Sequence, residues 1–159
     1  MEKIELTIPG KAVAKQSARF CQIAGFIKSY QKKDVIEYAN LVKLRFMNKY
    51  PEHKVENLKN KMLKITIIEF RQIPVNKSNK FKWLALNDFL RPITRPDTDN
   101  VAKNIKDSLN KIAYPDDSQI VTEHIEKHYS DNPRVEITIE EYHKCEEENS
   151  SEVIQAKLF

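Results

Sequence analysis

The chain has 159 residues, of which 40% are apolar and 31% are charged, which suffices for one compact domain and is short for two. No stretch approaches about 18 uninterrupted apolar residues, and residues 1–10 lack the pattern of a secretory signal, so we expect a cytoplasmic protein without a membrane span. Cys21 and Cys145 form no CxxC pair, which favours reduced thiols over a zinc site or a disulfide.

Positive charge is concentrated in the first part of the chain. Residues 1–96 contain 20 Lys and Arg against 8 Asp and Glu, whereas residues 97–159 contain 7 against 15. The net charges of the two parts are therefore +12 and −8. A positive excess of this kind suits a polyanion such as nucleic acid. A solvated lysine-rich surface is the alternative, and charge alone does not separate the two.

The first elements in chain order are a strand, an irregular segment and a helix. Residues 3–8 alternate apolar and polar side chains, as a half-buried strand does, and Pro9 follows at its end. Residues 11–31 are basic and irregular, with a hairpin expected around Gly25. Residues 32–50 repeat apolar side chains with the helical period and predict a helix.

The second half predicts strands around another helix. Residues 63–70 are apolar on both faces, which indicates a central strand. Residues 71–96 show no clear period and predict a long loop, a feature that is usually functional or mobile. Residues 99–112 predict a helix, and residues 120–129 and 134–140 predict two strands joined by a turn.

These elements indicate an α+β fold, with helices packed on a mixed β-sheet. We expect one domain over residues 1–143. Residues 144–159 contain three consecutive glutamates and two serines, and predict an acidic, loosely attached tail.

Two acidic pairs and a lysine form the most informative pattern. Asp97 and Asp99 lie where the loop enters the predicted helix, and Lys103 lies one turn beyond Asp99 on the same face. A second pair, Asp116-Asp117, follows the helix. Clustered carboxylates repel one another unless a cation neutralises them, and hard divalent cations prefer oxygen ligands. The alternative for the helix face is a set of weak surface ion pairs.

Carboxylates beside a lysine, in a protein with a basic surface, point to metal-assisted cleavage of a phosphodiester. The metal would lower the pKa of a bound water and bind phosphate oxygens. The lysine would supply a fixed positive charge where the anion develops. A calcium loop is a poor fit, because residues 97–100 lack the spaced third ligand, the turn glycine and the terminal Glu of an EF-hand.

At these residues the sequence resembles the RusA family of Holliday junction resolvases, the crossover junction endodeoxyribonucleases common in prophages. The family pattern stands here as Pro96-Asp97-Thr98-Asp99-Asn100-Val101-Ala102-Lys103, then Asp107-Ser108-Leu109-Asn110, then Asp116-Asp117-Ser118-Gln119-Ile120. The start of the chain and the segment from Lys127 to the last strand are also similar, so the resemblance covers about residues 1–140.

The resemblance implies a RusA-like two-layer architecture. It implies that Asp97, Asp99 and Asp117 hold the metal and that Lys103 is the catalytic lysine, with Asp116 the less certain member of its pair. The implied cofactor is Mg²⁺, for which Mn²⁺ can substitute. The resemblance further implies a homodimer that resolves four-way DNA junctions by paired, symmetric nicks during recombination and repair, where a two-fold protein matches a two-fold substrate.

Basic residues outside the motif are candidates for contacts with DNA phosphates. They are Lys11, Lys15, Arg19, Lys80, Arg95 and Lys127. Within the loop, aromatic residues including Trp83 and Phe89 alternate with lysines, and these rings either stack on unpaired bases or pack in a core or dimer contact. His124 and His128 would lie about 13 Å apart on a strand, which favours a surface role over metal binding.

Two functions follow from these patterns. The first is a Mg²⁺-dependent, structure-selective DNA endonuclease. The second is a non-catalytic DNA-binding protein whose acidic cluster holds a structural metal ion. The joint presence of three aspartates and the lysine favours the enzyme, because a degenerate relative is expected to lose at least one of them.

Overall fold

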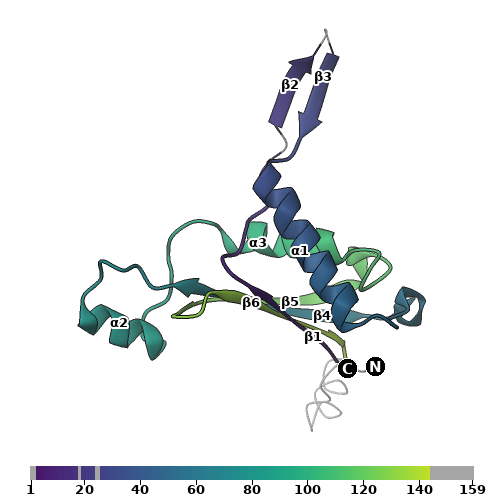
Figure 1. The fold of residues 1–159 in the computed structure, drawn as a ribbon. Helices are drawn as coiled ribbons and strands as arrows, with labels where there is room; N and C mark the ends of the chain where they lie inside the picture. Colours follow the sequence, from purple (N-terminus) through teal and green to yellow (C-terminus); the bar gives the residue numbers. More distant parts are fainter. Residues whose placement is uncertain (1–2, 18, 24–25, 144–159) are drawn as a thin grey trace, which may run out of the picture.

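Helices cover one face of a four-stranded sheet, which gives the two-layer α+β arrangement in Figure 1. The computed structural model describes residues 3–17, 19–23 and 26–143, and the acidic tail expected at 144–159 lies outside them. The strand order is β1-β6-β4-β5. The strands are β1 (Ile4–Pro9), β4 (Leu63–Gln72), β5 (Ile120–Ser130) and β6 (Arg134–Glu141). The α+β class with a mixed sheet is confirmed.

β4 is the central strand that its apolar sequence predicts. It pairs in parallel with β5 and antiparallel with β6. Its side chains alternate between the two faces, so that Leu63, Ile65 and Ile67 are fully buried beneath the helices. Because β4 and β5 run in parallel, their carboxyl ends lie at the same edge of the sheet.

Two helices supply the second layer through periodic apolar faces. Helix α1 (Lys33–Lys49) buries Val35, Tyr38, Val42 and Phe46, and α3 (Thr98–Leu109) buries the face that contains Val101, Ile105 and Leu109. Helix α3 is shorter than its predicted range of 99–112. The chain leaves the helix at Asn110, and Lys111 adopts a left-handed φ of 63°.

A hairpin lies in the basic segment, as the position of Gly25 predicts. Strands β2 (Arg19–Ile23) and β3 (Phe26–Tyr30) pair antiparallel as a separate two-stranded sheet. Figure 1 shows the hairpin projecting beyond the start of α1, away from the main sheet. Phe20 and Phe26 are 71% and 73% exposed.

The prediction of a structureless loop over residues 71–96 is wrong. This region contains helix α2 (Asn79–Leu86), which lies apart from α1 and α3 in Figure 1. Ser78 caps it, since the Phe81 N–H donates to the Ser78 hydroxyl at 3.3 Å. Five of its eight residues are apolar, but it buries only Ala85 and forms no clear apolar face, so the Ser78 cap is its clearest sequence signal.

Two short 3₁₀ turns complete the described structure. They are η1 (Val55–Leu58), within the polar connection before β4, and η2 (Asp117–Gln119), before β5. No helix in the described ranges combines the length and apolar character needed to cross a bilayer.

Candidate active site

Asp97 and Asp99 lie at the start of α3, which the end of β4 holds in place. Arg71 donates from Nη2 to the Pro96 carbonyl oxygen at 2.8 Å, and this carbonyl immediately precedes Asp97. Asp97 is the N-cap residue of α3, and its own carbonyl accepts the Val101 N–H at 3.3 Å. The pair therefore stands at the edge of the sheet where β4 ends.

The Asp97 carboxylate is not used as a helix cap. Its backbone has the extended conformation of an N-cap, yet its side chain accepts no hydrogen bond from the first turn of α3. A capping Asp stabilises a helix by about 1 kcal/mol, so this helix forgoes a common local stabilisation. Both Asp97 and Asp99 are exposed and so can meet a ligand from solvent.

Lys103 lies one turn beyond Asp99 and is exposed, as predicted. It borders a shallow polar pocket beside α3, whose lining residues are Lys15, Gln16, Ser17, Gln31, Asn100 and Lys103. The Lys15 N–H donates to the Asn100 carbonyl at 2.8 Å, which fixes the segment before the hairpin along α3. The pocket thus brings Lys15 and Lys103 to one hollow beside the first turns of α3.

Asp117 lies at the other end of α3. The side-chain amide of Gln119, in the same 3₁₀ turn, donates to the carbonyls of Leu58 and Lys61 at 2.7 and 3.0 Å, just before β4 begins. Asp97 is tied to Arg71, near the end of that strand. Because β4 has ten residues, its two ends are about 30 Å apart.

Electrostatics also place Asp117 beside the last turns of α3. Burial raises the pKa of Tyr114, and the charges of Asp117 and Asp107 raise it further. The Tyr114 hydroxyl donates to the Lys106 carbonyl at 2.9 Å, so these groups surround the end of the helix. Asp107 lies eight residues beyond Asp99, or about 12 Å along the helix axis.

Asp116 and Asp117 differ in how their carboxylates are engaged. Asp116 accepts the Ser118 N–H at 2.9 Å as the cap of η2, and hydrogen bonding with Ser118 lowers its pKa. Asp117 is exposed. Asp116 is exposed as well, so the two residues differ in this bond to the 3₁₀ turn and not in their access to solvent.

The expected convergence of Asp97, Asp99 and Asp117 is not seen in this structure. Among the described residues, no group of three or more His, Cys, Asp or Glu side chains is placed to hold a metal ion. The physical reason is that α3 separates the acids, since its 12 residues span about 18 Å. Carboxylate oxygens are ligands that suit Mg²⁺. Of the three expected ligands, however, only Asp97 and Asp99 lie together within one chain, at the start of α3.

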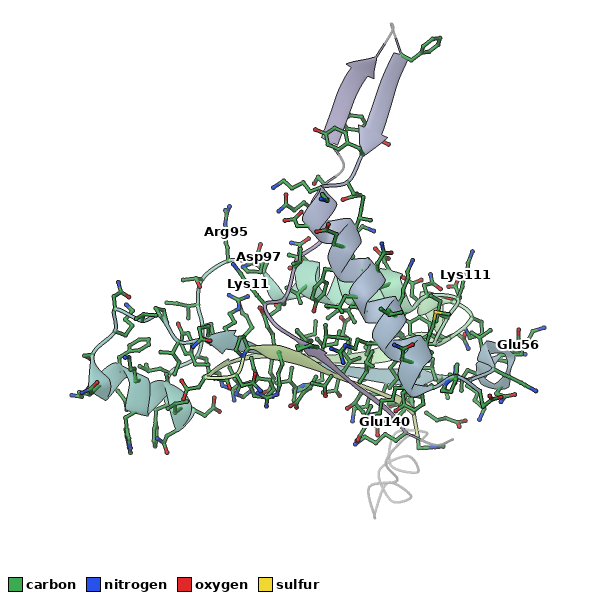
Figure 2. The ribbon with its side chains drawn as sticks, in the orientation of Figure 1. Lys11, Glu56, Arg95, Asp97, Lys111 and Glu140 are labelled. Atoms are coloured by element: carbon green, nitrogen blue, oxygen red, sulfur yellow. The ribbon has the colours of Figure 1, made fainter. Side chains whose placement is uncertain are left out.

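The basic residues proposed for DNA contacts fall into different settings. Lys11 and Arg95 are exposed and lie toward the same side of the molecule as Asp97 in Figure 2. Lys15 forms an ion pair with Asp107. The Lys127 ammonium lies 3.4 Å from both the Thr94 and Pro96 carbonyl oxygens. Of the other two candidates, Arg19 begins β2 and Lys80 is exposed on α2.

The sequence predicts only a surface position for His124 and His128, but the structure shows that they share a partner. His124 and His128 both contact Glu126, at 2.7 and 2.6 Å, and His128 also contacts Asp88 at 2.8 Å. Asp88 follows α2, and it accepts two hydrogen bonds from Arg91. We call Asp88, Arg91, Glu126 and His128 the α2 latch, because they join the α2 region to β5. Residues 124, 126 and 128 alternate along β5 and therefore share one face of the strand. No local pattern predicts their partners Asp88 and Arg91, which follow α2.

The aromatic residues near α2 are not part of the core. Trp83 and Phe89 stack with ring centroids 5.8 Å apart and remain 59% and 68% exposed. Phe81 differs, since its ring packs edge-on against Tyr129 with centroids 5.7 Å apart. The core alternative for Trp83 and Phe89 is therefore wrong, and the choice between DNA and a dimer contact stays open.

The site contains a carboxylate pair at the start of a helix, an exposed lysine one turn further and basic side chains nearby. These features define this α+β protein as a candidate nuclease. Comparison with protein families matches residues 9–140 to the family described as endodeoxyribonuclease RusA. This match covers most of the chain, which therefore belongs to the RusA endodeoxyribonuclease family. The resemblance inferred from the motif is confirmed, and so is the assignment as a nuclease.

Two curated proteins are similar along nearly their whole length. The uncharacterized protein YqaN of Bacillus subtilis (strain 168) is 32% identical over 148 residues, covering 89% of this chain and 98% of YqaN. The crossover junction endodeoxyribonuclease rusA of Lactococcus phage r1t is 28% identical over 140 residues, covering 87% of this chain and 97% of the phage protein.

Proposed function

We propose that this chain is a Mg²⁺-dependent, structure-selective endonuclease that resolves four-way DNA junctions. The observation that carries the proposal is the exposed Asp97 carboxylate, which makes no hydrogen bond to the N–H groups of the first helical turn. It lies beside Asp99 and Lys103, in a chain that belongs to an endonuclease family. The phage relative is named for crossover junction cleavage, which supports branched DNA as the substrate class.

The residues at the start of α3 have separable tasks in this proposal. Mg²⁺ commonly takes one or two carboxylates and completes its shell with waters and a substrate phosphate, which Asp97 and Asp99 can accommodate. Bound there, the ion would lower the pKa of a water and polarise the phosphate. Lys103 places a fixed positive charge beside the anion. Lys11 and Arg95, exposed toward the same side, bind flanking phosphates.

We further propose that the active form is a homodimer. Asp97 and Asp117 lie at opposite ends of α3, so an ion that binds both needs Asp117 from a second copy. A two-fold dimer also matches a four-way junction, in which two equivalent strands are cut.

A nicking assay on a synthetic four-way junction tests this function. The wild-type chain is incubated with Mg²⁺, with Mn²⁺ or with a chelator, and the cuts are mapped on all four strands. We expect paired nicks placed symmetrically about the branch point, only when the metal is present. Equal cleavage of a linear duplex would reduce the proposal to a general nuclease, and binding without cleavage would favour the non-catalytic alternative.

A further inference from the structure

A buried ion pair lies at the end of β4, next to the candidate site. Glu69 is only 2% exposed although its neighbours in the core are apolar. Arg71 binds both of its carboxylate oxygens, from Nε to Oε1 at 2.7 Å and from Nη2 to Oε2 at 2.8 Å. This two-point contact neutralises a carboxylate that has little access to water, and it fixes the plane of the guanidinium group.

The remaining donors of Arg71 bind the segment that leads into α3. Nη1 donates to the Thr94 carbonyl at 2.8 Å and to the Arg95 carbonyl at 3.2 Å, and Nη2 donates to the Pro96 carbonyl at 2.8 Å. Five hydrogen bonds therefore match the five N–H donors of an arginine. A lysine has three donors on one atom, so it cannot bind Glu69 at two points and reach all three carbonyls.

These bonds act on the backbone of Asp97 from one side, and the helix acts from the other. The Pro96 carbonyl belongs to the peptide group that contains the Asp97 nitrogen, so the bond from Arg71 restrains the orientation of that peptide. The Asp97 carbonyl is bonded in turn to the Val101 N–H at 3.3 Å. Since the Asp97 side chain makes no capping bond, its direction depends on how this backbone is held.

We infer that Arg71, oriented by Glu69, is a positioning residue for the cleavage reaction: it holds residues 94–96 so that the Asp97 carboxylate faces the metal and the phosphate. This inference rests on the proposed function of the α3 site. Arg71 touches neither ligand in this role. It lowers the cost of assembling the site, because a preorganised carboxylate need not be ordered when the substrate binds.

Arg71→Lys is the direct test, with Arg134→Lys as the matched control. Arg134 also sits on a strand, pairs with a Glu two residues away (Glu136, 2.7 Å) and donates to a loop carbonyl (Asn132, 3.1 Å), but its loop does not lead to α3. For Arg71→Lys we expect kcat to fall about 10–100-fold, as for other groups that orient metal ligands, with junction affinity unchanged within about twofold. Arg134→Lys should keep the wild-type kcat.

Two readouts other than activity accompany these rates. Hydrogen exchange of the Val101 amide should quicken in Arg71→Lys and not in Arg134→Lys, because that amide bonds to the Asp97 carbonyl. Mn²⁺ affinity, followed by electron paramagnetic resonance, should weaken by about tenfold in Arg71→Lys. A role limited to global stability would quicken exchange throughout the core instead.

A double variant tests the same inference without leaving an unpaired buried charge that could unfold the protein. Removal of Arg71 alone would leave the Glu69 charge buried without its partner, so we replace both by leucine, Glu69→Leu with Arg71→Leu. We expect this chain to fold and still to cleave at least about tenfold more slowly than wild type. The inference would be overturned if Arg71→Lys, or a folded double variant, kept the wild-type kcat. The nuclease proposal would then remain intact. A wild-type chain that does not cut junctions would overturn both.

Discussion

At the scale of single residues, Asp97 combines an N-cap position with a carboxylate that caps nothing. Because this side chain makes no capping bond that the substitution could remove, and Asn suits the N-cap position as well as Asp does, Asp97→Asn should leave the melting temperature unchanged. The substitution removes a negative oxygen ligand, and we expect junction cleavage to fall by roughly 100-fold or more while junction binding persists. A nicking assay and a gel-shift titration measure the two quantities on one preparation. Asp131→Asn, in the turn between β5 and β6, is the control.

The predicted result for Asp97→Asn separates three roles. A purely structural aspartate would lower the melting temperature together with the cleavage rate. A purely electrostatic one would change DNA affinity, since removing a negative charge near Lys11 and Arg95 favours phosphate binding. Persistent wild-type cleavage would remove Asp97 from the ligand set.

At the scale of elements, the α2 latch joins the α2 region to β5 through ionised carboxylates. Hydrogen bonds from His124 and His128, and the charge of Arg91, hold the pKa of Glu126 at about 2, below its ordinary 4.5. Arg91 and His128 likewise lower the pKa of Asp88. A depressed carboxyl pKa stabilises the fold above the ordinary value, and this contribution is lost as the pH falls toward the folded value.

We therefore expect the latch to weaken between pH 4.5 and about pH 2. Trp83 is the only tryptophan in the sequence and lies on α2, so its emission reports on this element. The difference in unfolding free energy between wild type and Glu126→Gln should shrink over this pH range, because the wild-type carboxyl becomes neutral. Glu56→Gln, on η1, is the control. A difference that stays constant with pH would contradict the latch.

The exposed Trp83–Phe89 stack carries a second prediction for this element. Helix α2 has no acidic residue, and Lys77 just before it and Lys80 on it are both exposed. An approaching DNA strand therefore meets cations and aromatic faces together. We expect the double variant Trp83→Ala with Phe89→Ala to bind a junction about tenfold more weakly, as for lost base stacking. Ile93→Ala, 96% exposed, should bind normally. Loss of dimerisation with DNA affinity retained would favour the dimer-contact alternative.

At the scale of the whole molecule, periodicity predicted the fold better than it predicted the site. Alternation in β1 and β6 and the apolar face of α3 depend on neighbours along the chain, so local patterns suffice. The distance between Asp117 and Asp97 depends on the direction in which α3 runs along the sheet. A sequence motif carries no information about that direction. The same limit applies to Arg71, whose carbonyl partners on residues 94–96 are more than twenty residues away in the sequence.

The separation of Asp97 and Asp117 along α3 leads to a prediction about two copies of the chain. If each metal ion is held by Asp97 of one chain and Asp117 of the other, then Asp97→Asn and Asp117→Asn chains should each be inactive alone. Mixed and reassembled, they should form heterodimers that contain one intact site. Random mixing makes half of the dimers mixed, so about a quarter of the wild-type sites should return.

The test measures single nicks in a four-way junction together with Mn²⁺ bound per dimer, and both should rise on mixing. A mixture of Asp97→Asn with Asp99→Asn is the control, because both changes then fall in the same half of the site and no intact site forms. If each site is instead built within one chain, every site in the Asp97→Asn and Asp117→Asn heterodimer carries one substitution, and mixing restores nothing. Mixtures that dimerise and bind the junction without regaining nicks would therefore assign Asp117 to a role outside a shared site.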